Sequence, residues 1–399
     1  MAAVSPARRA AYETLLRVFE QDAYADRAFR TAARDLDDRE RAFAQRLAYG
    51  SVQRVRTLDH AIDQLGKRPT RKLDPPVRAA LRLGAYQLGY TDTAPHAAAN
   101  ESVELVRRAR LERAVPFTNA VMRRLGAGMR DLLAALPEGA LKESYPDWIH
   151  ETFIRDLGPE GALGLERAMN EPLETVVRGD AVGEPTDVPG AYRVDRVDEQ
   201  LVAAGRIWPQ SRGSLVAGLA LGAREGERIL DLCAAPGGKT GQLAGDVTAV
   251  EIDAGRASEL RANLATMRHP ATVVEADGTD LPPELTGFDR ILLDAPCSGL
   301  GVLAQRPDLR WRARPLPDLQ LALLRAAAER VRPGGTIVYS VCTVNADENE
   351  AVVDASGLEV DPALAQEWPQ FVHPRRPEFL LTLPHVHGTS GFFVSRLRA

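Results

Sequence analysis

The chain from Gly226 onward alternates short apolar runs with helical stretches. Six strand-like runs follow one another in the order RILDLC, VTAVEID, ATVVEA, DRILLDA, GTIVYSVC and GFFVSRL. Stretches with helical spacing, such as GRASELRANLATM and PDLQLALLRAAAERV, separate most of them. Strands joined by helices build a doubly wound sheet, which binds ligands at the carboxyl ends of its strands. The pattern therefore predicts a Rossmann-like α/β domain over 216–399, with its site at those strand ends.

The preceding 215 residues have a different pattern. Apolar residues recur at helical spacing in AYETLLRVFE and RERAFAQRLAYGSVQRV, and Pro75, Pro95 and Pro116 suit the first turns of helices. Residues 1–130 are therefore predicted to form an all-α helical bundle. Residues 131–215, which mix helical stretches with the runs TVVRGD and YRVDRV, are predicted to form a small α+β linker domain, entered through a connecting segment near 126–141.

Charge is distributed unevenly along the chain. Residues 1–130 hold 24 Lys and Arg against 15 Asp and Glu, a net charge of +9, although the whole chain carries −5. The remainder therefore carries −14. A basic helical domain attracts polyanions such as RNA, while a solvated arginine-rich surface explains the same excess equally well.

Composition excludes several classes of protein. The longest apolar stretch, Leu215–Ala223, spans nine residues, far short of the ~20 that a membrane helix needs. The N-terminus has no apolar core typical of a secretory signal. Three cysteines without a CxxC motif indicate a reducing compartment. We therefore expect a cytoplasmic protein without a membrane partner.

A glycine-rich turn follows the first strand in LDLCAAPGGKT, and a helix is expected after it. Small residues let backbone amides approach a ligand, and a helix N-terminus favours an anionic group. The turn matches neither the P-loop nor GxGxxG. Glu251, after the second strand, is placed to bind ribose hydroxyls, and Asp277, after the third, to reach an adenine edge. This combination favours S-adenosyl-L-methionine over a simple structural turn.

Two cysteines end neighbouring strands, Cys297 in DAPCSGLG and Cys342 in YSVCTV. A lone cysteine on a strand is most often an inert buried side chain. Two of three cysteines at adjacent strand ends, beside a cofactor turn, favour chemistry instead. A zinc site is disfavoured because no further ligand pair lies near them, so no metal is expected.

A thiol beside a methyl donor suits methylation of a pyrimidine. A thiolate that adds to carbon 6 makes carbon 5 nucleophilic enough to accept a methyl group. A neighbouring acid such as Asp294 can hydrogen-bond cytosine while the ring accepts sulfur. A second thiol then assists release of the product. The residues alone leave open which of the two cysteines attacks.

The motifs LDLCAAPGGKT, LLDAPCSGLG, YSVCTVNADENE and GFFVSRL resemble those of the RNA (cytosine-5) methyltransferases. The N-terminal stretches TAPHAAANESVELVRRA and FTNAVMRRL resemble the RNA-binding factor NusB. That pairing resembles the bacterial small-subunit (16S) rRNA methyltransferases of RsmB type, and it implies a class I methyltransferase fold after a NusB-like bundle. Cytosine-5 methylation of tRNA, and a non-catalytic RNA-binding or antitermination factor, remain as alternatives.

The resemblance implies roles for individual residues. Cys342 would be the nucleophile, Cys297 the thiol that assists release, and Asp294 the acid at the base. The implied cofactor set consists of Cys233, Ala234, Ala235, Pro236, Gly237, Gly238, Lys239, Glu251, Asp277 and Asp294. The chain departs from the family pattern at Ser211 and at Ser390, where the family usually carries acids.

Overall fold

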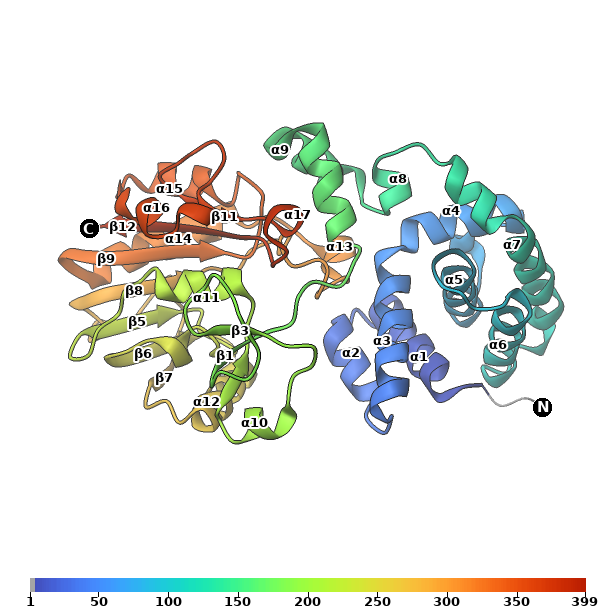
Figure 1. The fold of residues 1–399 in the computed structure, drawn as a ribbon, viewed down its shortest axis with the longest axis horizontal. Coiled ribbons are helices and arrows are strands. Elements are labelled where there is room, and N and C mark those ends of the chain that lie inside the picture. The colour runs from blue at the N-terminus through green and yellow to red at the C-terminus, as the bar shows by residue number, and fades with distance from the viewer. Residues whose placement is uncertain (1–3) are drawn as a thin grey trace. The chain divides into compact units, whose positions relative to one another are not determined.

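The computed structural model describes residues 4–399, which form two compact units. The first unit contains the chain up to Asn170 together with Leu303–Arg312, and the second contains Glu171–Val302 and Ala313–Ala399. The chain therefore passes from one unit to the other three times. Figure 1 shows the elements of both units.

The first unit is all-helical, as the sequence predicts for residues 1–130. Its main helices are α1 (Pro6–Glu20), α2 (Ala25–Ala32), α3 (Asp38–Gln53), α4 (Val55–Gly66), α5 (Pro75–Tyr90), α6 (Pro95–Arg108), α7 (Val115–Ala135), α8 (Ala140–Glu143) and α9 (Asp147–Ala168). Helices α5 and α6 begin at prolines, whose fixed φ angle suits a first turn. Helix α9 is broken at Gly158, which has a φ angle of 74°.

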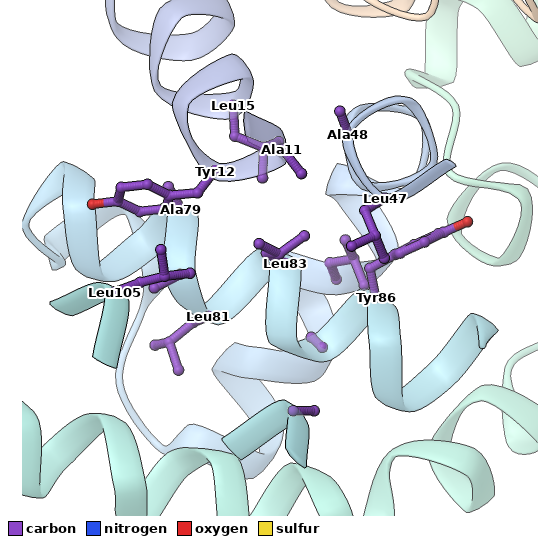
Figure 2. Packing of buried hydrophobic residues seen from close by; sticks show 14 of the residues in the cluster. Ala11, Tyr12, Leu15, Leu47, Ala48, Ala79, Leu81, Leu83, Tyr86 and Leu105 are labelled. Carbon is purple, nitrogen blue, oxygen red and sulfur yellow. The ribbon is translucent and has the colours of Figure 1, made fainter. Parts of the chain in front are cut away.

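Helix α5 is the centre of this bundle. It packs against α1, α3, α4, α6 and α7, and apolar side chains cover all sides of it. A helix that is apolar all round is stable only inside a core. Figure 2 shows Leu83 of α5 between Leu15 of α1 and Leu47 of α3, and all three are buried. Each such burial contributes about 1.5–3 kcal/mol to folding.

The prediction of a connecting segment near 126–141 was wrong, because α7 continues to Ala135 and α8 begins at Ala140. Val121, Met122, Leu125 and Met129 recur at helical spacing and are buried, which offsets the cost of the glycines in this helix. The expected boundary at residue 130 lies inside α7. The residues expected as one small domain are divided, with 131–170 in the first unit and 171–215 in the second.

A segment from the second half of the sequence completes the first unit. Leu303–Arg312, which ends in α13 (Leu309–Arg312), carries the fully buried Arg310. Its Nη1 donates to the carbonyl of Gln53 at 3.0 Å and to Asn170 Oδ1 at 2.9 Å, and its Nη2 donates to the Tyr145 hydroxyl at 2.8 Å. The guanidinium also lies 3.7 Å from the centre of the Tyr145 ring. Burial lowers the pKa of Arg310 to about 10.

The second unit begins with a small antiparallel sheet of order β2-β3-β1-β4. Its strands are β1 (Val176–Gly179), β2 (Glu184–Pro185), β3 (Ala191–Arg193) and β4 (Ile207–Pro209), with α10 (Glu199–Ala203) before β4. Val176, Val188 and Ala191 belong to the same apolar core as Leu215 of α11 (Arg212–Leu219) and as Leu292 and Val338 of the larger sheet. The small sheet is therefore built onto the α/β domain.

The larger sheet has eight strands in the order β10-β12-β9-β8-β5-β6-β7, and β11 pairs with β12. The strands are β5 (Arg228–Leu232), β6 (Asp246–Glu251), β7 (Thr272–Glu275), β8 (Phe288–Asp294), β9 (Val331–Val341), β10 (Glu359–Val360), β11 (Leu380–Thr382) and β12 (Phe392–Arg398). Strands β5 to β9 are parallel, and the strand order reverses between β5 and β8 (Figure 1). The six predicted strands are all present, and the predicted doubly wound fold is confirmed.

The remaining helices connect or cover these strands. They are α11 (Arg212–Leu219), α12 (Ala254–Met267), α14 (Pro317–Arg330), α15 (Glu350–Ser356), α16 (Ala363–Glu367) and α17 (Pro384–His387). Helix α12 packs against β6 and β7, and α14 packs against β8 and β9. Among residues 4–399, no helix has the length and apolar character needed to span a bilayer.

Replacing Arg310 tests how much the inserted segment stabilises the first unit. Arg310→Met leaves buried oxygens of Gln53, Asn170 and Tyr145 without their donor, so we expect the free energy of unfolding to fall by about 3 kcal/mol. Urea unfolding measures this change. The matched control is Arg46→Met on the exposed face of α3, which should change stability by less than about 0.5 kcal/mol. Equal effects of both variants would contradict a stabilising role for Arg310.

Candidate active site

The glycine-rich turn lies directly after β5, at the carboxyl edge of the sheet. Cys233 adopts a left-handed conformation with a φ angle of 60°, and Gly237 has a φ angle of 101°. The Gly237 amide donates to the Ala234 carbonyl at 2.8 Å, which closes the turn. A Cβ atom at residue 237 would lie 2.7 Å from Leu260 Cδ1, so this position requires glycine.

The helix expected after this turn is absent from the described structure. Residues Thr240–Gln242 form a single 3-10 turn, and β6 begins at Asp246. The six residues between Lys239 and β6 leave no room for a longer helix. The prediction that a helix N-terminus would attract an anionic group here was therefore wrong.

Two acidic residues end the next two strands, as the sequence predicts. Glu251 is the last residue of β6 and is buried, and its Oε1 accepts a hydrogen bond from the Asp253 amide at 3.1 Å. Its Oε2 is buried without a hydrogen bond from any described residue, although Arg256 forms an ion pair with it at 3.5 Å. Asp277 follows β7, is exposed, and accepts hydrogen bonds from the Thr279 amide and hydroxyl, which lower its pKa.

The two cysteines at the ends of β8 and β9 lie side by side. Their sulfur atoms are 3.4 Å apart. Strand register explains the contact, because Asp294 pairs with Ser340 across the two parallel strands and each cysteine follows within three residues. Asp294 Oδ2 accepts a hydrogen bond from Lys239 Nζ at 2.7 Å, and its Oδ1 accepts one from the Ser340 hydroxyl at 2.9 Å.

The surroundings of the two thiols differ in charge. A hydrogen bond from Cys297 and the nearby Lys239 ammonium lower the pKa of Cys342, against the opposing effects of burial and Asp294. The same hydrogen bond, together with burial, raises the pKa of Cys297 well above its usual value. Burial and the Glu251 carboxylate raise the pKa of the third thiol, Cys233, to about 12. Cys342 is therefore the cysteine most readily ionised.

The loop that carries Cys297 is fixed by backbone contacts. The Gly301 amide donates to the Cys342 carbonyl at 3.0 Å, and the Gly391 amide donates to the Gly301 carbonyl at 2.8 Å. A Cβ atom at residue 301 would lie 2.1 Å from the Gly391 oxygen, so only glycine fits. The spacing between the two sulfurs therefore depends on a close approach of three backbone segments.

The structure brings the predicted residues into two adjoining groups. Residues 233–239, Glu251 and Asp277 lie at the carboxyl ends of β5, β6 and β7, and the two cysteines lie at the ends of β8 and β9. The ion pair between Lys239 and Asp294 joins the two groups. Within residues 4–399, no cluster of three or more His, Cys, Asp or Glu side chains is arranged to hold a metal ion.

Comparison with known proteins decides the family. A family model for the 16S rRNA methyltransferases RsmB/F matches residues 218–398, and one for the NusB family matches residues 5–127. The chain is 36% identical to ribosomal RNA small subunit methyltransferase B of Thermus thermophilus, over 83% of this chain and 81% of the relative. The chain belongs to the RsmB/F family. It is an S-adenosylmethionine-dependent rRNA methyltransferase.

Further relatives agree with this assignment. The ribosomal RNA small subunit methyltransferase B of Salmonella newport is 31% identical, with 90% of this chain and 91% of that protein covered. The crystal structure of PH0851 superposes with a TM-score of 0.81 at 22% identity, with 100% of both chains covered, and shows that the fold is shared.

The residues at the ends of β5 and β6 fit S-adenosylmethionine. The buried Glu251 Oε2 has an acceptor position available for a ribose hydroxyl, and the turn 234–237 brings backbone atoms to the sheet edge without large side chains. The exposed Asp277 supplies a polar group beyond the neighbouring strand. The cofactor carries a sulfonium methyl group, which is electrophilic.

Sequence reasoning missed a side chain of the small sheet that holds the cofactor turn. Arg178 of β1 lies beside Gly238, whose carbonyl oxygen is 3.4 Å from its Nη2, and its Nε donates to Gln210 Oε1 at 3.0 Å. Burial lowers its pKa to about 10, and no carboxylate among the described residues pairs with it. An arginine inside the apolar run TVVRGD was the signal available in the sequence.

The two departures from the family pattern have structural roles. The Ser211 side chain caps α11 by accepting a hydrogen bond from the Ser214 amide at 3.4 Å. Ser390 is buried, and its carbonyl accepts a hydrogen bond from the Thr382 hydroxyl. Neither residue replaces a group of the cysteine pair.

The role of Arg178 is testable through cofactor affinity. Arg178→Met removes the donor that holds Gly238 and Gln210, so we expect the Kd for S-adenosylmethionine to rise about tenfold, equivalent to about 1.4 kcal/mol. Isothermal titration calorimetry measures this change. The control, Arg206→Met, removes an exposed arginine that pairs with Asp180 and should leave the Kd unchanged. An unchanged Kd for Arg178→Met would contradict the role.

Proposed function

We propose that this protein methylates carbon 5 of a cytosine in 16S rRNA through a covalent bond between Cys342 and the base. The observation that carries this proposal is the pair of thiols 3.4 Å apart, next to Asp294 and one strand away from the cofactor turn. A methyltransferase acting on a nitrogen or oxygen atom needs no such pair, whereas an unreactive carbon requires nucleophilic activation.

In the first step, the Cys342 thiolate donates an electron pair to carbon 6 and forms a carbon–sulfur bond. The electrons of the carbon 5–carbon 6 double bond move into the ring toward the O2 and N3 side. Asp294 is partly exposed and is held by Lys239 and Ser340, and we propose that its carboxylate accepts a hydrogen bond from the exocyclic amine of cytosine. The Lys239 ammonium favours both the thiolate and the charge that develops on the ring.

In the second step, the electron pair now available at carbon 5 forms the bond to the methyl group, whose bond to the sulfur of S-adenosylmethionine would break, and the third step releases the product. The carbon 5 proton leaves to water, the double bond reforms, and the bond from carbon 6 to the Cys342 sulfur breaks. Cys297, whose raised pKa keeps it a thiol, donates its hydrogen bond to the departing sulfur. This contact stabilises the thiolate that elimination produces.

The first unit is proposed to dock the RNA. Its residues 1–130 carry a net charge of +9, which suits contacts with phosphates, and the NusB family match covers the same stretch. That match favours rRNA over tRNA as the substrate.

A looped-out or single-stranded cytosine is needed, because stacked bases are inaccessible to a thiol. The three free thiols suit a reducing compartment, and we place the reaction in the cytoplasm.

Single cysteine variants test the covalent mechanism. We expect Cys297→Ala to accumulate RNA bound through Cys342, because the departing thiolate loses its donor. Cys342→Ala, the matched control, should form no adduct and transfer no methyl group. Denaturing electrophoresis with labelled 16S rRNA and S-adenosylmethionine detects the adduct, and bisulfite sequencing locates 5-methylcytosine. The mechanism would be contradicted if the Cys342→Ala protein still methylated the RNA, or if the Cys297→Ala protein formed no adduct.

The pH dependence of adduct formation tests the thiolate. Because Cys342 attacks as a thiolate, the rate should rise with pH through its lowered pKa and then level off. Lys239→Met removes a charge that favours the thiolate, so the rising limb should move up by ~1 pH unit. Lys142→Met, which removes a lysine paired with Glu138 in the first unit, serves as the control and should keep the wild-type midpoint. A Lys239→Met midpoint at or below the wild-type value would contradict the assignment.

A further inference from the structure

A buried carboxylate lies behind the two cysteine loops, on the chain segment that follows Cys342. The Glu348 side chain is fully buried, yet five donors surround it. Its Oε1 accepts hydrogen bonds from the Ser298 amide at 2.9 Å, the Leu316 amide at 3.1 Å and Gln320 Nε2 at 3.1 Å. Its Oε2 accepts from the Ser298 hydroxyl and from Asn345 Nδ2 at 3.3 Å.

Hydrogen-bond donors surround both carboxylate oxygens of Glu348. Two backbone amides and the Gln320 side-chain amide donate to Oε1, whereas the Ser298 hydroxyl and the Asn345 side-chain amide donate to Oε2. Ion pairs between Glu348 and a Lys, Arg or His side chain are absent from the described chain. Its charge is therefore stabilised by oriented dipoles alone, and these come from the cysteine loops and α14.

The Glu348 contacts join the residues that follow the two cysteines. Ser298, next to Cys297, donates to Glu348 through both its amide and its hydroxyl. Its hydroxyl lies 2.9 Å from the Thr343 hydroxyl, next to Cys342, so the order of donation runs from Thr343 to Ser298 to Glu348. The Glu348 carbonyl also accepts a hydrogen bond from the Tyr339 hydroxyl of β9 at 2.6 Å. One buried residue thus contacts both loops.

We propose that Glu348 is a positioning residue that fixes the spacing of the cysteine loops and maintains Cys297 as the thiol partner of a Cys342 thiolate. This role rests on the proposed function, since it concerns the same pair of thiols. Glu348 does not contact the reacting atoms, and it acts through Ser298 and Thr343. A neutral side chain of the same shape would keep the packing but lose the charge on the Cys297 side.

The charges around the thiol pair agree with this asymmetry. On the Cys342 side, Lys239 favours the thiolate and Asp294 opposes it. On the Cys297 side, the hydrogen bond with Cys342 and burial raise the pKa of the thiol, and the Glu348 carboxylate adds to this effect. Lys239, acting on Cys342, and Glu348, acting on Cys297, therefore both favour a Cys342 thiolate beside a Cys297 thiol.

Thiol selectivity measures this role without RNA or cofactor. The full-length protein is treated with limiting iodoacetamide near pH 8, and mass spectrometry follows the modified peptides of Cys342 and Cys297. In the wild type we expect Cys342 to react first. In Glu348→Gln we expect the ratio of the Cys342 rate to the Cys297 rate to fall about tenfold, as for a shift of one pKa unit.

A matched control lies two residues along the chain. Glu350 is also buried, but its Oε1 lies 2.9 Å from His373 Nε2, and among the described residues it forms no hydrogen bond with either thiol. Glu350→Gln should therefore keep the wild-type ratio, and thermal unfolding shows whether each variant is folded. If Glu348→Gln fails to fold, Ser298→Ala removes the hydroxyl contact alone and should lower the ratio about threefold.

The possible outcomes separate this role from the proposed function. The role of Glu348 would be overturned if a folded Glu348→Gln protein kept the wild-type ratio of the Cys342 rate to the Cys297 rate. Where Ser298→Ala is measured instead, an unchanged ratio in that variant would overturn it. An equal fall in Glu350→Gln would overturn it too, because the effect would then be general. A wild-type protein that reacts first at Cys297 would instead overturn the proposed assignment of the nucleophile.

Discussion

The parallel pairing of β8 with β9 is the constraint on which the site depends. Asp294 and Ser340 occupy one rung of this pairing, and each strand continues into a cysteine loop. Because parallel strands end at the same edge of a sheet, two residues 45 positions apart in sequence have sulfur atoms 3.4 Å apart. The pairing of β8 with β5 places the same pair beside the cofactor turn. Shifting either strand by one residue would turn these side chains to the opposite face.

Fully or partly buried charged groups that are held by neutral dipoles recur in both units. Arg310 donates to carbonyl, amide and hydroxyl oxygens inside the first unit, and Arg178 donates to Gln210 beside the cofactor turn. Glu348 accepts only from neutral donors. A buried charge is costly unless its hydrogen-bonding capacity is satisfied, so each of these groups fixes the backbone segments around it. They stabilise particular loop positions more than they add to the core.

Patterns with local causes were predicted well from the sequence. Apolar periodicity located the helices of residues 1–130 and the six strands of the sheet, because burial of one face or both faces follows directly from side-chain order. Cys297, Cys342, Glu251 and Asp277 were placed at strand ends for the same reason. Predictions failed where local composition and tertiary packing disagreed. The glycines of 126–141 indicated a connection, whereas burial of Leu125 and Met129 extends α7 to Ala135.

By itself, the sequence determined the order of elements, the family and the strand ends that carry the reactive groups, since each depends on residues close together in the chain. Only the tertiary structure decided the contacts over long sequence distances. In the tertiary structure, Arg310 donates hydrogen bonds to Gln53 and Tyr145, and Arg178 lies beside Gly238. Five donors from separate parts of the chain surround Glu348. Such contacts leave no periodic signal in the sequence. One polar residue in an apolar run gives the same sequence pattern whether its side chain is exposed to solvent or is buried and hydrogen-bonded. The three-dimensional path of the backbone alone determines which partner it meets.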